Sequence, residues 1–152
     1  MFDIQVDRES LLVSSRDPRF LTGDVWLRLD GKAFPSCNWS DSPLSVLGSL
    51  RSAILEVRSG LTADMYFFDG PYFAKLAPDG QAGNEQTIKV TGICDRHPPE
   101  DSTDGGVAEV EVLADLPEME GSYSRAVQEL YGWATDNCES AVLELLAKMR
   151  LV

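Results

Sequence analysis

The sequence predicts one α+β domain over residues 1–152, a mostly antiparallel β-sheet with two helices packed on one face. Several segments alternate apolar and polar side chains, as half-buried strands do, whereas only two segments have helical spacing. These segments follow the order strands, helix, strands, helix, without the regular alternation that builds a parallel sheet. Of the 152 residues, 43% are hydrophobic, which is enough for one substantial core.

The N-terminal strands are predicted from period-two patterns. Two short strands are indicated at residues 4–6 and 11–13, on either side of a polar stretch. Residues 24–29 alternate, and the Asp30-Gly31 pair that follows is typical of a type I′ turn. We therefore expect a β-hairpin here, and its inner face should carry Val25, Leu27 and Leu29.

The first helix is predicted at residues 43–58. Ser42 can cap its N-terminus, and Pro43 suits the first helical position, where a missing N–H costs nothing. Apolar side chains then recur every three or four residues before Gly60, namely at Leu44, Leu47, Leu50, Ile54 and Val57.

Strand patterns resume in the second half of the chain. Residues 65–68 and 72–76 flank an Asp-Gly-Pro turn and predict a second hairpin. Two further strands are expected at 86–94 and 107–113, with a loop at 95–105 between them. In the last strand, one face should carry Ala108, Val110 and Val112, and the other Glu109 and Glu111.

The C-terminal region predicts one long amphipathic helix over about residues 122–149, kinked or broken near Gly132 or Asn137. Its apolar stripe comprises Val127, Leu130, Tyr131, Ala134, Cys138, Ala141, Val142, Leu145 and Met149.

Composition limits the cellular setting that we expect. The chain starts without a basic region followed by an apolar run, and no stretch approaches the roughly 20 apolar residues of a membrane span. We therefore expect a cytoplasmic protein without a membrane partner. The three cysteines are odd in number and lack metal-type spacing, which favours reduced thiols over disulfides or zinc.

The sequence contains few of the residues and motifs on which enzyme catalysis depends. His97 is the only histidine, and it lies in a predicted surface loop, where a general base lacks rigid support. Gly105 and Gly106 precede a strand, whereas a phosphate-binding loop places glycines before a helix. No serine has the surroundings of a hydrolase nucleophile. We therefore expect no enzyme activity, cofactor or metal.

The most informative feature is the distribution of charge. The net charge is −12, with −2 in residues 1–76 and −10 in residues 77–152. A field of this sign repels nucleic acid and attracts basic partners. Nine of the carboxylates lie between residues 95 and 120, those of Asp95, Glu100, Asp101, Asp104, Glu109, Glu111, Asp115, Glu118 and Glu120.

This acidic run has several interpretations. Its spacing lacks the calcium-loop pattern, and a paired-carboxylate hydrolase would need two acids in a cleft. A solvated acidic face that maintains solubility is one remaining interpretation. The other is a docking surface for a basic protein, formed by the run from Glu100 onward.

Trp26 is a further candidate for partner binding. It alternates to the side of Asp24, Arg28 and Asp30, opposite the apolar face of its strand. An outward tryptophan is a possible anchor of an interface, unless a helix packs on that side and buries it.

One half of the chain resembles a known class of proteins. The order Gly31-Lys32-Ala33-Phe34-Pro35, Trp39-Ser40-Asp41, an amphipathic helix and Phe67-Phe68-Asp69-Gly70-Pro71-Tyr72 is similar to that in small bacterial immunity proteins. Such proteins are encoded beside polymorphic or contact-dependent toxins and neutralise them. The resemblance covers about residues 24–76. It implies a single cytosolic domain without catalysis, which occludes or displaces a toxin's working surface.

The charge and the resemblance lead to one hypothesis. We expect an acidic immunity-type protein that covers a basic toxin C-terminal domain, a nuclease or similar. The alternative is an acidic adaptor or scaffold that binds a basic protein without neutralising a toxin.

Overall fold

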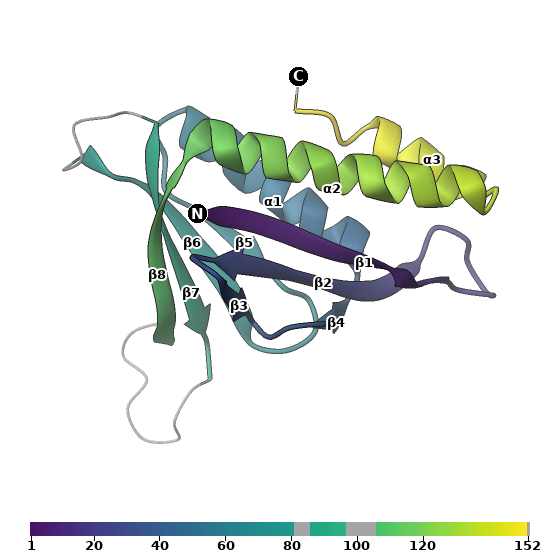
Figure 1. The fold of residues 1–152 in the computed structure, drawn as a ribbon, viewed down its shortest axis with the longest axis horizontal. Coiled ribbons are helices and arrows are strands. Elements are labelled where there is room, and N and C mark those ends of the chain that lie inside the picture. The colour runs from purple at the N-terminus through teal and green to yellow at the C-terminus, as the bar shows by residue number, and fades with distance from the viewer. Residues whose placement is uncertain (81–85, 97–105, 152) are drawn as a thin grey trace.

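The computed structural model describes residues 1–80, 86–96 and 106–151, and it confirms the α+β class. Within these residues the strands form two four-stranded antiparallel sheets rather than the one predicted sheet. Three helices gather on one side of the strands (Figure 1). None of the helices in the described residues is long and apolar enough to cross a membrane.

The first sheet is built around its second strand. It contains β1 (Phe2–Val13), β2 (Leu21–Leu29), β3 (Lys32–Phe34) and β4 (Ser40–Asp41). β2 pairs with β1 on one side and with β3 and β4 on the other. The predicted hairpin is confirmed, because β2 and β3 flank Asp30 and Gly31, both of which have positive φ.

The two predicted N-terminal strands are one continuous strand, β1, with an irregularity between Asp7 and Leu12. The polar stretch remains in the sheet because the Ser10 hydroxyl replaces backbone pairing. Ser10 Oγ accepts a hydrogen bond from the Asp24 N–H at 2.7 Å and donates one to the Asp7 carbonyl at 2.6 Å. The alternation of apolar residues in the sequence cannot show that a side-chain hydroxyl takes the place of backbone pairing.

The second sheet has the order β5-β6-β7-β8, with bounds β5 (Ala63–Tyr66), β6 (Tyr72–Pro78), β7 (Thr87–Cys94) and β8 (Val107–Asp115). The prediction for one face of β8 was wrong in part. Gly92 pairs with Val110, but Ile93 pairs with Ala108, so Glu109 is an extra residue on β8. This bulge interrupts the alternation and leaves Ala108 exposed, while Ala114 is buried with Val112.

The first helix, α1 (Pro43–Arg58), has the predicted bounds, although the Ser42 side chain makes no capping bond. The predicted C-terminal helix is two helices, α2 (Leu116–Asp136) and α3 (Ser140–Ala147). α2 begins earlier than predicted because Leu116 and Met119 extend its buried stripe toward β8. The break falls near Asn137, one of the two predicted places, where Cys138 has a φ of 55°.

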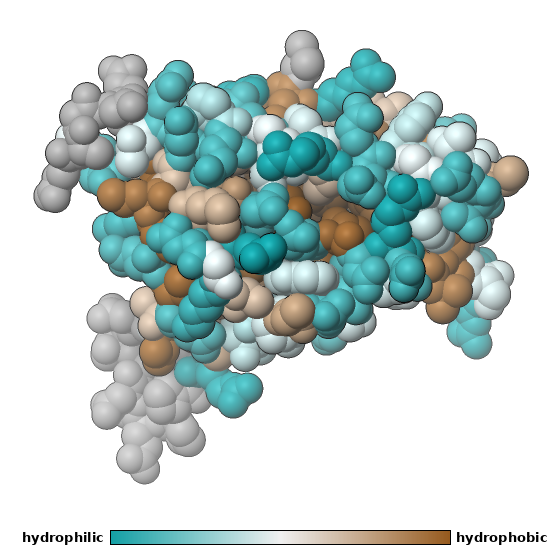
Figure 2. Space-filling view, viewed as in Figure 1, coloured by the Kyte–Doolittle hydropathy of each residue, from teal (hydrophilic) through white to brown (hydrophobic). Residues whose placement is uncertain are grey.

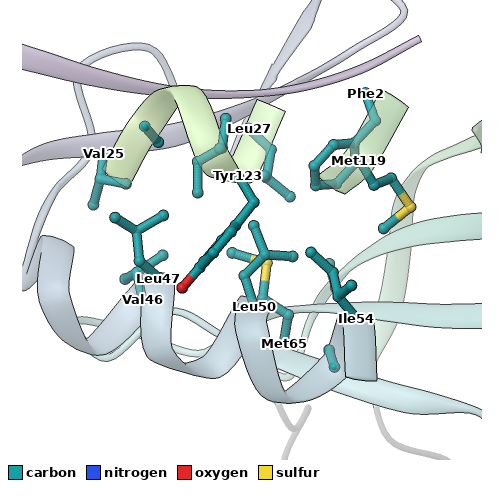
Figure 3. Close-up of a cluster of buried hydrophobic side chains, with 14 of the residues drawn as sticks. Phe2, Val25, Leu27, Val46, Leu47, Leu50, Ile54, Met65, Met119 and Tyr123 are labelled. Carbon is teal, nitrogen blue, oxygen red and sulfur yellow. The ribbon is translucent and has the colours of Figure 1, made fainter. Parts of the chain in front are cut away.

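The core lies between β2, β5, α1 and α2 (Figure 3). Val25 and Leu27 of β2 point toward Leu47 and Leu50 of α1, as their spacing predicted. Tyr123 of α2 reaches down between them and is 1% exposed. Burial of these apolar side chains is the main favourable contribution to folding.

Asp41 connects three parts of the chain. The residue is 7% exposed, and its carboxylate accepts four hydrogen bonds. Oδ2 accepts from Trp39 Nε1 at 3.0 Å and from the N–H groups of Phe68 and Asp69 at 2.9 and 3.1 Å. Oδ1 accepts from the Ser42 N–H at 2.7 Å, directly before α1. Asp41 thus ties β4 and the start of α1 to the turn between β5 and β6.

Aromatic rings pack around this carboxylate. The Trp39 and Tyr72 rings meet edge-on with centroids 5.2 Å apart, and Phe34 makes similar contacts with Phe67 and Tyr72 at 6.0 and 5.8 Å. Gly70 has a φ of 102°, and a Cβ there would lie 3.3 Å from the Trp39 ring. The segments that carry the resemblance therefore meet in space, and these contacts are structural.

We expect Asp41→Ala to lower the free energy of unfolding by about 3 kcal/mol, because four partly buried donors lose their charged acceptor. Urea unfolding of the two proteins measures the loss. Asp69→Ala is the matched control, since it removes an exposed carboxylate but keeps the backbone N–H that Asp41 binds. Equal losses in the two variants would contradict the central role of Asp41.

Candidate functional site

The predicted acidic surface is only partly described by the structure. Glu100, Asp101 and Asp104, together with His97, lie outside the described residues. Glu109, Glu111 and Asp115 are exposed on β8, Asp115 at the position that precedes α2.

Two of the predicted acidic residues make contacts within the protein. Glu118 Oε1 accepts a hydrogen bond from the Phe2 N–H of β1 at 2.8 Å. Glu120 forms an ion pair with Arg58 of α1 at 2.7 Å, and the hydrogen bond raises the pKa of that guanidinium above its usual value. Both contacts hold α2 against its neighbours, so these side chains have a structural role whether or not they also bind a partner.

The two glutamates of β8 do not have the regular spacing of a flat strand, because Glu109 is the bulge residue. Its carbonyl oxygen accepts a hydrogen bond from Lys32 Nζ at 3.0 Å, which places the end of the β2–β3 hairpin beside β8. The exposed carboxylates of β8 therefore adjoin the first sheet.

The outer edge of β1 is covered by α2. Ser122 Oγ accepts from the Ile4 N–H at 2.8 Å and donates to Asp3 Oδ1 at 2.6 Å. With the contact between Glu118 and Phe2, these bonds satisfy edge groups that would otherwise invite another strand. The first sheet is therefore closed at this edge and open on its outward face.

Trp26 lies on that outward face, as its alternation predicted. Val25, Leu27 and Leu29 are fully buried on the opposite face, toward α1. Figure 1 shows α1 behind β1 and β2, so their outward face is turned toward the viewer. Figure 2 shows hydrophilic and near-neutral side chains over these strands, next to a hydrophobic patch near the middle of the view. No helix in the described residues covers Trp26, and the indole is half-buried between its neighbours on the sheet.

The register of β1 and β2 surrounds Trp26 with charge. Gln5 lies directly opposite Trp26, and the flanking pairs are Asp3 with Arg28 and Asp7 with Asp24. Residues opposite one another in an antiparallel pair point to the same face. We name this surface the Trp26 face and define it as Asp3, Gln5, Asp7, Asp24, Trp26 and Arg28.

The pair of Asp7 and Asp24 is unfavourable for folding, because like charges directly opposite one another repel. Asp7 Oδ1 accepts from the Glu9 N–H at 3.1 Å, and Asp24 Oδ2 accepts from Asn38 Nδ2 at 3.3 Å. Among the described ion pairs, none includes either carboxylate. A cation supplied from outside would relieve this repulsion.

The sequence pattern predicted the direction of Trp26 and placed Asp24 on the same side, but it missed Asp3 and Asp7 of the neighbouring strand. Residues 3–7 do alternate, with acidic and amide side chains between Ile4 and Val6. This pattern does not show which strand lies beside them, and only the register places Asp7 opposite Asp24.

The described residues show no convergence of three histidine, cysteine or carboxylate side chains that could hold a metal ion. Comparison of the chain with protein-family models, curated proteins and solved structures finds no match.

We expect Asp7→Asn to raise the free energy of unfolding by about 0.5 kcal/mol at low salt, because it removes one charge of the opposed pair. The amide oxygen can still accept from the Glu9 N–H. The gain should shrink at high salt, which screens exposed charges. Urea unfolding at two salt concentrations checks both expectations. Glu9→Gln makes the same change of charge at an exposed neighbour and should have little effect, and a loss of stability in Asp7→Asn would contradict the assigned repulsion.

Proposed function

We propose that this protein is a non-catalytic, acidic binding protein of the immunity type, which neutralises a basic toxin domain in the cytoplasm by covering the toxin's working surface. The observation that carries the proposal is the Trp26 face, an uncovered sheet surface with an aromatic centre between carboxylates. The net charge of −12 favours a basic partner and disfavours nucleic acid and anionic membranes.

The chemistry of the Trp26 face suits cationic side chains of a partner. A guanidinium can stack on the indole of Trp26 and donate hydrogen bonds to a carboxylate beside it. Tryptophan is also enriched among the residues that dominate binding energy at interfaces. Insertion of a cation between Asp7 and Asp24 removes the repulsion that the free protein retains, which adds to the gain on binding.

The remaining carboxylates strengthen this proposal through long-range attraction. Toxin domains that attack nucleic acid are cationic where they bind phosphate, and an anionic protein is suited to cover that surface. The exposed carboxylates of β8 adjoin the first sheet, and the acidic segment before β8 adds further negative charge. We assign this role to Glu100, Asp101, Asp104, Glu109, Glu111 and Asp115.

Co-expression tests the proposal. The partner is a toxin C-terminal domain encoded immediately upstream of this chain, and the unchanged chain should restore growth of cells that produce it. We expect Asp7→Lys with Asp24→Lys to abolish protection and to weaken binding by about 2 kcal/mol or more, because attraction becomes repulsion at a desolvated contact. The same reversals at Glu109 and Glu111 should cost less, since these residues lie on β8, outside the Trp26 face.

Glu56→Lys with Glu144→Lys is the matched control, because it changes the net charge equally at exposed helix positions away from the Trp26 face. Circular dichroism establishes that each variant is folded. Equal losses from the control pair would show that net charge alone acts and would contradict the assigned surface. Binding of a basic partner without protection of cells would contradict the immunity role and favour the acidic adaptor.

A further inference from the structure

A groove of about 510 Å³ runs between α2 and the C-terminal segment, on a different part of the molecule from the Trp26 face. α3 lies beside the end of α2 in Figure 1, and the chain then returns along it. Val127 and Tyr131 of α2 form one wall, and Leu143, Met149 and Leu151 form the other. The volume falls within the range of about 300 to 1,000 Å³ that is usual for sites of small molecules.

The wall that carries Met149 and Leu151 is held in place by hydrogen bonds to three consecutive backbone carbonyl groups. The Tyr123 hydroxyl donates to the Met149 carbonyl, Arg51 Nε to that of Arg150 at 2.8 Å, and Arg58 Nη1 to that of Leu151 at 2.9 Å. Burial raises the pKa of Tyr123 to about 12, so its hydroxyl keeps the proton and remains a donor at neutral pH. These three hydrogen bonds preorganise the wall.

The charge of the groove is opposite to that of the protein. Arg150 is the one charged residue among the described residues that line it, and none of these residues is acidic. The Arg150 guanidinium takes part in none of the described ion pairs. In a chain with 25 acidic and 13 basic residues, an apolar groove whose single charge is a cation favours an anionic ligand.

We propose that this groove binds a linear amphipathic carboxylate of the free fatty-acid type, with its chain along Val127, Leu143 and Met149 and its head group on Arg150. A guanidinium matches a carboxylate with two parallel hydrogen bonds. The apolar walls supply the remaining affinity by burial of the chain. This binding site is independent of the immunity role, because none of its residues belongs to the Trp26 face.

Calorimetric titration of the full chain with dodecanoate, below its micellar concentration, tests the proposal. Dodecyltrimethylammonium is the control, because it has the same tail and a head group of opposite charge. Nonspecific attraction to this acidic protein would favour binding of the cationic control. We expect saturable binding of one dodecanoate and at least a fivefold preference for it over the cation. Either no saturable binding of dodecanoate or a preference for the cation overturns the proposal.

Variants locate the site. We expect Arg150→Gln to remove the preference for the carboxylate, whereas Lys148→Gln, the neighbouring cation that does not line the groove, should retain it. Ala147→Trp should abolish binding by filling the groove from an exposed position, and circular dichroism checks that it is folded. Unchanged binding in both Arg150→Gln and Ala147→Trp would place the ligand elsewhere and overturn the assignment.

Discussion

The structure depends on the buried carboxylate of Asp41. Its four hydrogen bonds join the end of the first sheet, the start of α1 and the first turn of the second sheet. A buried charge is tolerated only when its acceptor sites are satisfied, and the Trp39 indole, the adjacent Ser42 N–H and two N–H groups from the turn after β5 satisfy this one. Because α1 is fixed against the inner faces of both sheets, the outward face of the first sheet stays open to solvent.

Local patterns predicted the elements that depend on local chemistry. The α1 bounds follow from Pro43 and the leucine spacing, and the first hairpin follows from Asp30-Gly31. The division into two sheets, the continuity of β1 and the early start of α2 were not predictable in this way. They depend on contacts between residues far apart in sequence, such as those of Ser10 with Asp24 and of Glu118 with Phe2.

Only part of the candidate site could likewise be predicted from local sequence patterns. Alternation predicted the direction of Trp26, since the side chains of a strand point to opposite faces in turn. Alternation also placed Asp24 on that side, but Asp3 and Asp7 could be added only from the pairing of β1 and β2, which sets Asp7 against Asp24. Conversely, the density of acidic residues after Asp95 did not reveal that Glu120 is paired with Arg58. Proximity in sequence is therefore a poor guide to which charges are available to a partner.

Docking of the proposed partner on the Trp26 face can be tested with the indole N–H signals in a nuclear magnetic resonance spectrum. The chain has three tryptophans, one on this face, one bonded to Asp41 and one, Trp133, on α2. On addition of the proposed toxin domain, the Trp26 signal should shift or broaden strongly, while those of Trp39 and Trp133 change little. An unchanged Trp26 signal in a complex that shifts Trp133 would contradict docking on the Trp26 face.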